Sequence, residues 1–177
     1  MKRHDASVST DEFVRSCVDV PRLEKYCSEC PGYGQSWMCP PFGFDVMVIW
    51  KWYSRIRLTG VQIFPDYDSV PAEKSTKDMI TEALKYEKNK LANNIWACET
   101  ATPGSMCFLA GVCGLCENCA RKENLPCRNP ENARYSIEGI GADVGIAARK
   151  YFNVELQWPV NGRYPEYYTV MMALLMQ

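Results

Sequence analysis

The sequence has a single histidine, His4, and no strong excess of charge of either sign. Twenty lysines and arginines stand against 21 aspartates and glutamates, which gives a formal net charge of −1. One histidine largely excludes a histidine-based catalytic triad or a histidine-rich metal site. Nucleic-acid binding needs a concentrated basic surface, so we expect no nucleic-acid partner. His4 stands in a polar stretch that we expect to be a mobile, solvated tail.

Long apolar runs and linkers are also missing. The longest clean apolar run, 170–176, is far too short to cross a bilayer, so we expect no membrane partner. The first thirteen residues contain no apolar segment of the kind found in secretory signals. No internal repeat and no stretch rich in glycine, serine or proline divides the chain. The sequence therefore predicts a single domain over residues 1–177, located in the cytoplasm.

Cysteine is the one residue type in unusual number, with ten in the chain. Disulfides, zinc and iron–sulfur clusters are the three uses that require cysteines. A cytoplasmic chain long enough to bury a core is a poor candidate for disulfides, because its compartment is reducing. Eight of the ten cysteines fall into two compact groups, which scattered buried thiols would not produce. The pattern therefore indicates bound metal.

The sharper group contains Cys113, Cys116 and Cys119, with Cys127 eight residues further on. Three thiols at positions i, i+3 and i+6 allow one tight loop to wrap a cubane cluster. Zinc sites more often pair two separate Cys-x-x-Cys turns, so Zn²⁺ is the alternative reading. Cys127 could complete the same cluster or ligate a second one, as in ferredoxins with two clusters. This group favours a [4Fe–4S] cluster.

The other group contains Cys27, Cys30 and Cys39, and Cys17 ten residues upstream is a candidate fourth ligand. Pro40 directly follows Cys39, and proline after the last cysteine is typical of bacterial ferredoxin motifs. With Cys17, each group is a closed set of four thiolates, and electron relay is the simpler role. Without Cys17, a cubane held by three thiolates leaves one iron open to a substrate, which is enzyme chemistry.

Basic residues flank the second group, and two acidic residues follow it. The basic residues could offset the negative charge of thiolate-bound clusters, receive an acidic partner, or simply form a solvated helix face. They are Arg121, Lys122, Arg128 and Arg134. We expect Arg128 to contact the cofactor, because it directly follows Cys127. Glu138 and Asp143 could act as acid–base groups, although capping and salt bridging are commoner uses of such residues.

The order of helical and strand patterns predicts an α+β fold. We expect a mainly antiparallel sheet with helices on one face and the cysteine-rich metal-binding loops at one end. Periodicity and capping signals predict helices over 10–17, 45–53, 71–96 and 142–152, with another beginning at Asn129-Pro130. Alternation predicts strands over 56–63, 105–110, 154–158 and 167–175, the last two joined by a turn at Asn161-Gly162. Gly60 interrupts its strand, as a bulge or in a strand covered on both faces.

Two cysteine motifs resemble those of a known but uncharacterised family. The first is Cys27-Ser-Glu-Cys30-Pro-Gly-Tyr-Gly-Gln-Ser-Trp-Met-Cys39-Pro-Pro. The second begins at Gly111-Val-Cys113-Gly-Leu-Cys116-Glu-Asn-Cys119 and continues through Pro126-Cys127-Arg128-Asn-Pro130 to Val144. The chain, from about residue 20 onward, is similar to a domain of unknown function regarded as a predicted metal-binding protein and frequent in anaerobic bacteria and methanogenic archaea. The resemblance implies metal binding by seven cysteines; Cys17, Cys98 and Cys107 lie outside the family pattern.

Taken together, these features predict a protein that binds one or two [4Fe–4S] clusters and acts as a redox or electron-transfer accessory. We expect a redox partner protein, and the sequence leaves the oligomeric state open. One alternative is a reductase or sulfur-handling enzyme whose cluster presents an open iron to its substrate. The other is a structural zinc-binding module that mediates protein interactions.

Overall fold

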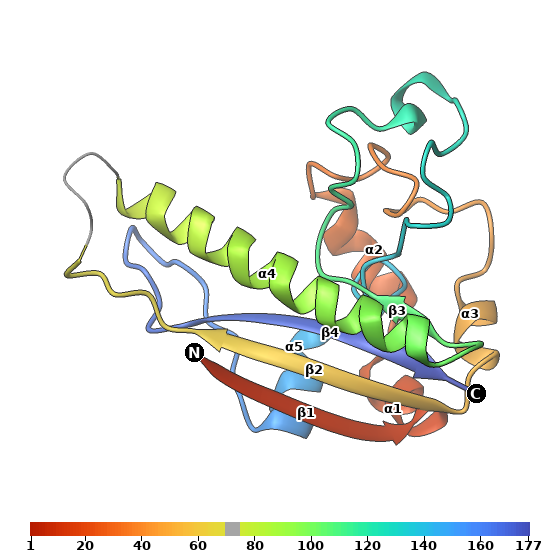
Figure 1. Cartoon of the computed structure of the whole chain (residues 1–177), viewed down its shortest axis with the longest axis horizontal. Helices are drawn as coiled ribbons and strands as arrows, with labels where there is room; N and C mark the ends of the chain where they lie inside the picture. Colours follow the sequence, from red (N-terminus) through yellow and green to blue (C-terminus); the bar gives the residue numbers. More distant parts are fainter. Residues whose placement is uncertain (70–74) are drawn as a thin grey trace.

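The centre of the molecule is a four-stranded sheet with the strand order β1-β2-β4-β3 (Figure 1). The structure is a computed structural model that describes residues 1–69 and 75–177. Every pairing in the sheet is antiparallel. The strands are β1 (Lys2–Ser9), β2 (Arg55–Ile63), β3 (Met106–Phe108) and β4 (Tyr168–Met176). The prediction of an α+β fold with an antiparallel sheet is confirmed.

Local capping signals explain where several helices begin. The Ser9 hydroxyl accepts a hydrogen bond from the backbone of Glu12, and the Ser75 hydroxyl accepts one from Asp78. The helices predicted over 10–17 and 142–152 are present, the second ending in a π-helical turn. Part of the helix predicted over 71–96 lies outside the described residues. The helical elements are α1 (Thr10–Cys17), α2 (Val20–Ser28), α3 (Met47–Lys51), α4 (Thr76–Ala101), η1 (Ala120–Glu123), α5 (Val144–Ala147) and η2 (Ala148–Phe152).

Strand β2 is covered on both faces, which explains its unusual pattern. Ile56 and Leu58 belong to one hydrophobic cluster, whereas Val61 and Ile63 belong to a second. The pairing register runs through Gly60 without interruption, so a bulge at this position is wrong. A Cβ atom at Gly60 would lie 2.5 Å from the ring of Phe152. The glycine is therefore needed for space.

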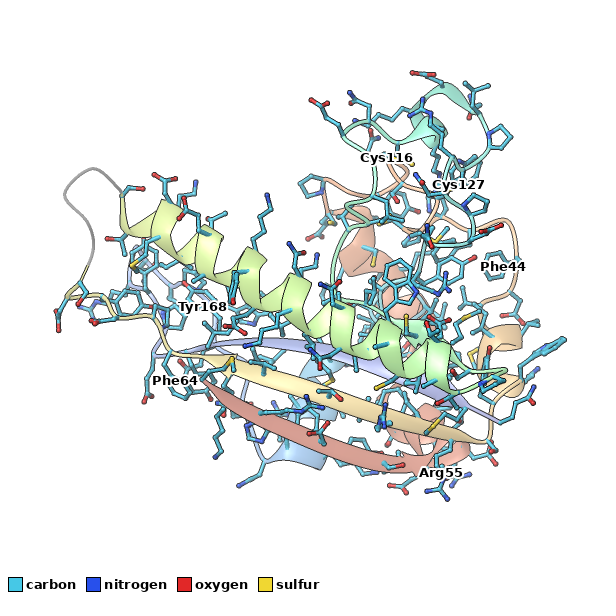
Figure 2. All side chains as sticks on the ribbon, viewed as in Figure 1. Phe44, Arg55, Phe64, Cys116, Cys127 and Tyr168 are labelled. Atoms are coloured by element: carbon cyan, nitrogen blue, oxygen red, sulfur yellow. The ribbon has the colours of Figure 1, made fainter. Side chains whose placement is uncertain are left out.

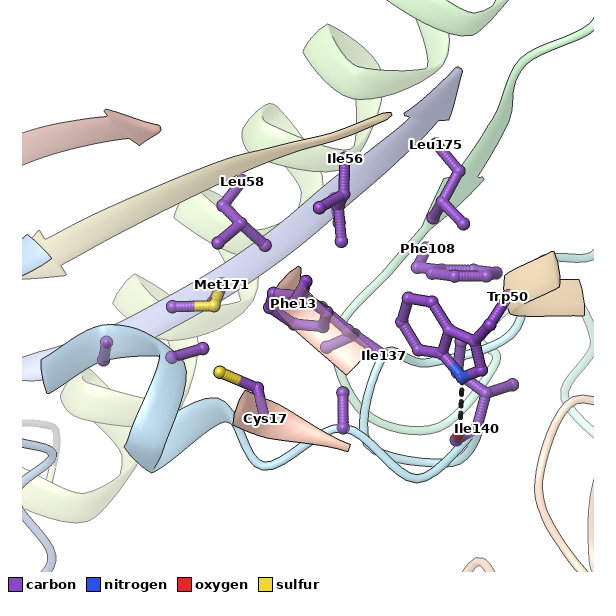
Figure 3. Close-up of a cluster of buried hydrophobic side chains, with 14 of the residues drawn as sticks. Phe13, Cys17, Trp50, Ile56, Leu58, Phe108, Ile137, Ile140, Met171 and Leu175 are labelled. Carbon is purple, nitrogen blue, oxygen red and sulfur yellow. Dashed lines mark hydrogen bonds between the residues drawn. The ribbon is translucent and has the colours of Figure 1, made fainter. Parts of the chain in front are cut away.

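Helices cover both faces of the sheet, not one face as the sequence predicts. On one face, α4 buries Leu91 and Ile95 against the sheet. On the other, α1, α3 and α5 surround a core in which the indole N–H of Trp50 donates to the carbonyl of Ile140 at 3.0 Å (Figure 3). Phe13 contacts the ring of Trp50 in the same core. None of the helices in residues 1–69 and 75–177 is long and apolar enough to cross a membrane.

Three local predictions are wrong, and a fourth is right in type but too long. Residues 2–9 form the edge strand β1, where His4 Nε2 lies 2.8 Å from Gln62 Oε1, so the expected mobile tail is wrong. Asn129-Pro130 begins a single turn and no helix. The turn at Asn161-Gly162 is present, but residues 154–158 form no strand; β4 pairs with β2 along its whole length and with β3 only at 173–175. The helix predicted over 45–53 is shorter, at 47–51.

Candidate metal centre

The two cysteine-rich segments lie side by side and project away from the sheet (Figure 1). Trp37 Nε1 donates a hydrogen bond to the carbonyl of Leu125 at 2.8 Å. The guanidinium of Arg121 donates to three carbonyls of the first segment, those of Ser36 at 2.7 Å and of Cys39 and Pro41 at 2.5 Å each. Segments separated by about eighty positions in the sequence are thereby joined, and their cysteines share one region of the molecule.

Four cysteines of the second segment line a single cavity. They are Cys113, Cys116, Cys119 and Cys127, and the wall also includes Ser36 and Trp37 of the first segment. Figure 2 shows Cys116 and Cys127 near each other at the end of the molecule furthest from the sheet. The volume of this cavity is about 20 Å³. The close spacing of Cys113, Cys116 and Cys119 predicts that these three lie together, and the structure adds Cys127, whose place the sequence left open.

Backbone N–H groups point at several of the sulfur atoms. The N–H of Gly32 donates to Cys30 Sγ, and that of Asn129 donates to Cys127 Sγ, each at 3.4 Å. The side-chain amide of Asn129 also donates to Cys116 Sγ at 3.2 Å. Hydrogen bonds to sulfur favour the thiolate, and the thiolate is the form that binds metal. The N–H groups therefore stand where they would support sulfur atoms bound to a metal.

Cys119 has the most favourable surroundings for a thiolate. Burial raises the pKa of its thiol, but the backbone N–H groups of Arg121 and Trp37 and the hydroxyl of Ser36 outweigh burial. The charge of Arg121 acts in the same direction, so the net pKa of Cys119 is lowered. Burial raises the pKa of Cys113, and the negative charges of the other three cysteines in the cavity add to that rise. A bound cation would reverse this mutual repulsion.

Cys27, Cys30 and Cys39 form a second set next to the first. Burial raises the pKa of Cys27 to about 11, and the charges of Cys30 and Cys39 contribute. Burial likewise raises the pKa of Cys39, whereas the backbone N–H of Cys113 acts to lower it. Cys39 and Cys113 are therefore the point at which the three-thiol and four-thiol sets meet.

The remaining three cysteines lie elsewhere. Cys17 ends helix α1 with 2% of its surface exposed, and it packs in the core close to Phe13 (Figure 3). Cys107 is fully buried beneath α4 and its thiol donates to Glu99 Oε2 at 2.9 Å, whereas Cys98 packs at the edge of the same cluster. We therefore leave Cys17 out of the proposed ligand set, which leaves the first group with three thiols. All ten cysteines are free.

The thiols surround the cavity but do not yet form a closed coordination shell. Across residues 1–69 and 75–177, no three histidine, cysteine, aspartate or glutamate side chains are arranged so that they could hold a metal ion. The donor chemistry nevertheless fits a thiophilic metal, because soft thiolates supported by N–H groups are the ligands of zinc and of iron–sulfur clusters. Metal binding would then draw the loops together, since binding and folding are coupled in such sites.

Arg121, and not Arg128, is the arginine that faces the cysteines. Arg128 Nη1 donates to the carbonyl of Asn118 at 2.8 Å, and its Nη2 lies 3.9 Å from a carboxylate oxygen of Glu123, so it closes its own loop. The position of Arg128 next to Cys127 predicts a contact with the cofactor, but adjacency in the chain does not set the direction of a side chain. The contributions of Ser36 and Asn129 were also missed. A usable signal for Asn129 and Arg121 is their position two residues after a cysteine.

A comparison with protein-family models gives one match, to the family described as predicted metal-binding protein (DUF2284), over residues 14–176. The chain belongs to this family. The match confirms the resemblance stated on the two cysteine motifs and covers both cysteine groups. A search of the curated proteins and of the solved structures found no match. Membership supports metal binding, without specifying the metal.

Proposed function

We propose that the four cysteines of the cavity hold a [4Fe–4S] cluster and that the protein is a redox or electron-transfer accessory. The observation that supports this most directly is the gathering of Cys113, Cys116, Cys119 and Cys127 around one cavity with N–H groups directed at sulfur. A bound cluster supplies one-electron transfer, at a potential set by its charge, its exposure and its hydrogen bonds.

The residues around the cavity have distinct roles in this proposal. Arg121 supplies positive charge beside Cys119 and ties the two segments together. Asn129 orients Cys116 and Cys127 through its amide and backbone N–H groups. We propose a redox partner protein as the source or acceptor of electrons, and the cytoplasm as the location, where thiols stay reduced.

The three-thiol group favours a second candidate, an enzyme. With Cys17 buried in the core, Cys27, Cys30 and Cys39 would hold a cluster by three thiolates and leave one metal position free. A free position acts as a Lewis acid toward a substrate, which suits a reductase or a sulfur-handling enzyme. Both candidates share the four-thiol site and differ only in the use of the first group.

The size of the cavity favours a third candidate, a structural zinc site. About 20 Å³ is room for one water-sized occupant, so a single Zn²⁺ requires less movement of the loops than a cubane does. Such a site would stabilise the two loops as a surface for protein interactions.

Metal analysis after anaerobic reconstitution tests the proposal. Two clusters would give about eight irons and about eight sulfides for each chain, and one cluster about four of each. Cys116→Ala should lose the cluster of the four-thiol site, whereas Cys98→Ala, the matched control, should keep it. A colourless protein that binds zinc and no sulfide would overturn the iron–sulfur proposal. A cluster spectrum changed by added cyanide would favour the enzyme over the relay.

A further inference from the structure

A larger cavity lies between helix α4, the first half of strand β4 and residues 156–158. Its volume is about 310 Å³ and its walls are mainly apolar, formed by side chains that include Leu84, Val144, Leu156 and Met171. Trp158, 70% exposed, stands at its rim. Tyr168 also lines it, and Figure 2 shows this tyrosine far from Cys116 and Cys127. The volume falls at the lower end of the range for small-molecule sites.

Two buried oxygen atoms from residues that line this cavity have no hydrogen-bond partner. They are Glu138 Oε2 and Thr169 Oγ1, and neither finds a partner among residues 1–69 and 75–177. An unpaired polar atom away from water is costly, so native proteins leave few of them. Of the four such atoms found among residues 1–69 and 75–177, two belong to residues of this cavity, where a bound molecule can supply the missing partners.

The charges around the cavity restrict the chemistry of that occupant. Glu138 brings a carboxyl group close to the backbone N–H of Gly111 and the hydroxyl of Ser136, and α4 contributes Lys85 and Lys88 to the same wall. A cationic ligand would meet the lysines, and an anionic ligand would meet the carboxyl group. A neutral molecule avoids repulsion by either the lysines or the carboxyl group. Its hydroxyl or amide group can donate a hydrogen bond to one of the two unpaired oxygens and accept one from the other.

A neighbouring groove connects this cavity with the cysteine loop. The groove shares Lys88, Ala110 and Gly111 with the cavity, and it is lined further along by Cys113 and Leu115. Gly111, at the junction of the two, has a φ of 64°, a backbone conformation that favours glycine. A molecule in the cavity is therefore separated from the four-thiol site by one groove.

We propose that this cavity binds a small neutral molecule with an apolar body and one hydroxyl or amide group that pairs with Glu138 and Thr169. The cavity is a binding site in its own right. That its occupant is a substrate of the metal centre rests on the proposed function.

Binding of a simple probe to the full-length chain tests this inference. Benzyl alcohol has the required ring and hydroxyl group, toluene lacks the hydroxyl, and benzylamine and benzoate add charge of either sign. Titrations followed by protein-observed NMR should show benzyl alcohol binding more tightly than the other three probes. Thr169→Val removes one hydroxyl at nearly constant shape. It should lower the affinity for benzyl alcohol about tenfold and change the affinity for toluene little. Glu138→Leu should act in the same way, and Thr100→Val, at an exposed position of α4, is the control.

Several outcomes would overturn the inference. They are the absence of benzyl alcohol binding, equal affinity for toluene and benzyl alcohol, and an unchanged affinity for benzyl alcohol in a folded Thr169→Val variant. Metal is counted in the same samples, so the two proposals fail separately. Failed alcohol binding with iron and sulfide present refutes the cavity site alone. Alcohol binding in a chain that takes up no iron refutes the proposed function alone.

Discussion

Arg134 and Glu99 form a largely buried ion pair that fastens the second cysteine segment to helix α4. Arg134 Nε lies 3.0 Å from both carboxylate oxygens of Glu99, and the two side chains are 18% and 12% exposed. Glu99 also accepts the thiol hydrogen of Cys107, and the guanidinium of Arg134 lies over the ring of Trp96. The chain that leaves Cys127 is therefore anchored, within seven residues, to the longest helix of the described chain.

Removing one member of this pair should be strongly destabilising. Glu99→Gln leaves the Arg134 guanidinium without its counter-charge in a mostly buried place, and we expect a loss of about 3 kcal/mol in the free energy of unfolding. Denaturant unfolding measures this loss. Glu155→Gln is the control, because its partner Arg149 and Glu155 itself are each 62% exposed and should contribute far less. Equal losses in both variants would contradict the buried anchor.

Cys17 and Cys116 should respond in opposite ways to replacement by alanine. Cys17→Ala leaves a small void in the core, so we expect a loss of about 1 kcal/mol in stability with the metal content unchanged. Cys116→Ala should lower the metal content, because its sulfur lines the four-thiol cavity. Metal counting and thermal unfolding of both variants give the comparison. Metal loss in Cys17→Ala would return this residue to the ligand set.

Glu138 should make stability depend on pH. Burial raises the pKa of its carboxyl group above the usual 4.5. Its contribution to stability is therefore complete below about pH 4.5 and is lost as the pH rises through the raised value. Glu138→Gln removes this titration, so the stability of the variant relative to the parent should rise as the pH increases above about 4.5. Denaturant unfolding across this range checks the trend, and a constant difference would contradict it.

Gly60 should tolerate no side chain. A Cβ atom at this position would lie 2.5 Å from the Phe152 ring, so Gly60→Ala forces the ring or the strand to move. We expect a loss of about 1–3 kcal/mol in the free energy of unfolding. Phe152→Leu shortens the opposing side chain and should recover part of that loss when the two changes are combined. Additive losses in the double variant would show that crowding by Phe152 is not the cause.

Local signals in the sequence carry much of the fold and part of the site. The caps at Ser9 and Ser75 act within three residues of themselves, so they are readable without knowledge of the rest of the chain. The same holds for the spacing of Cys113, Cys116 and Cys119, because one short loop brings the three thiols to one cavity. The family of the chain also follows from these motifs alone.

Long-range contacts decide the remaining features of the fold and of the site. Residues 2–9 become a strand only because β2 supplies their hydrogen bonds, and polar composition gives no sign of that partner. Cys17 and Cys39 both lie in or near the first motif, but their surroundings differ. Cys17, at the end of α1, packs in the core, whereas Cys39 lies beside Cys113 at the site. Arg121 crosses to the first segment because the two loops fold against each other. The sequence thus determined which atoms are available as ligands. The tertiary structure decided which of them lie together, because residues eighty positions apart in the sequence come into contact only when the chain folds.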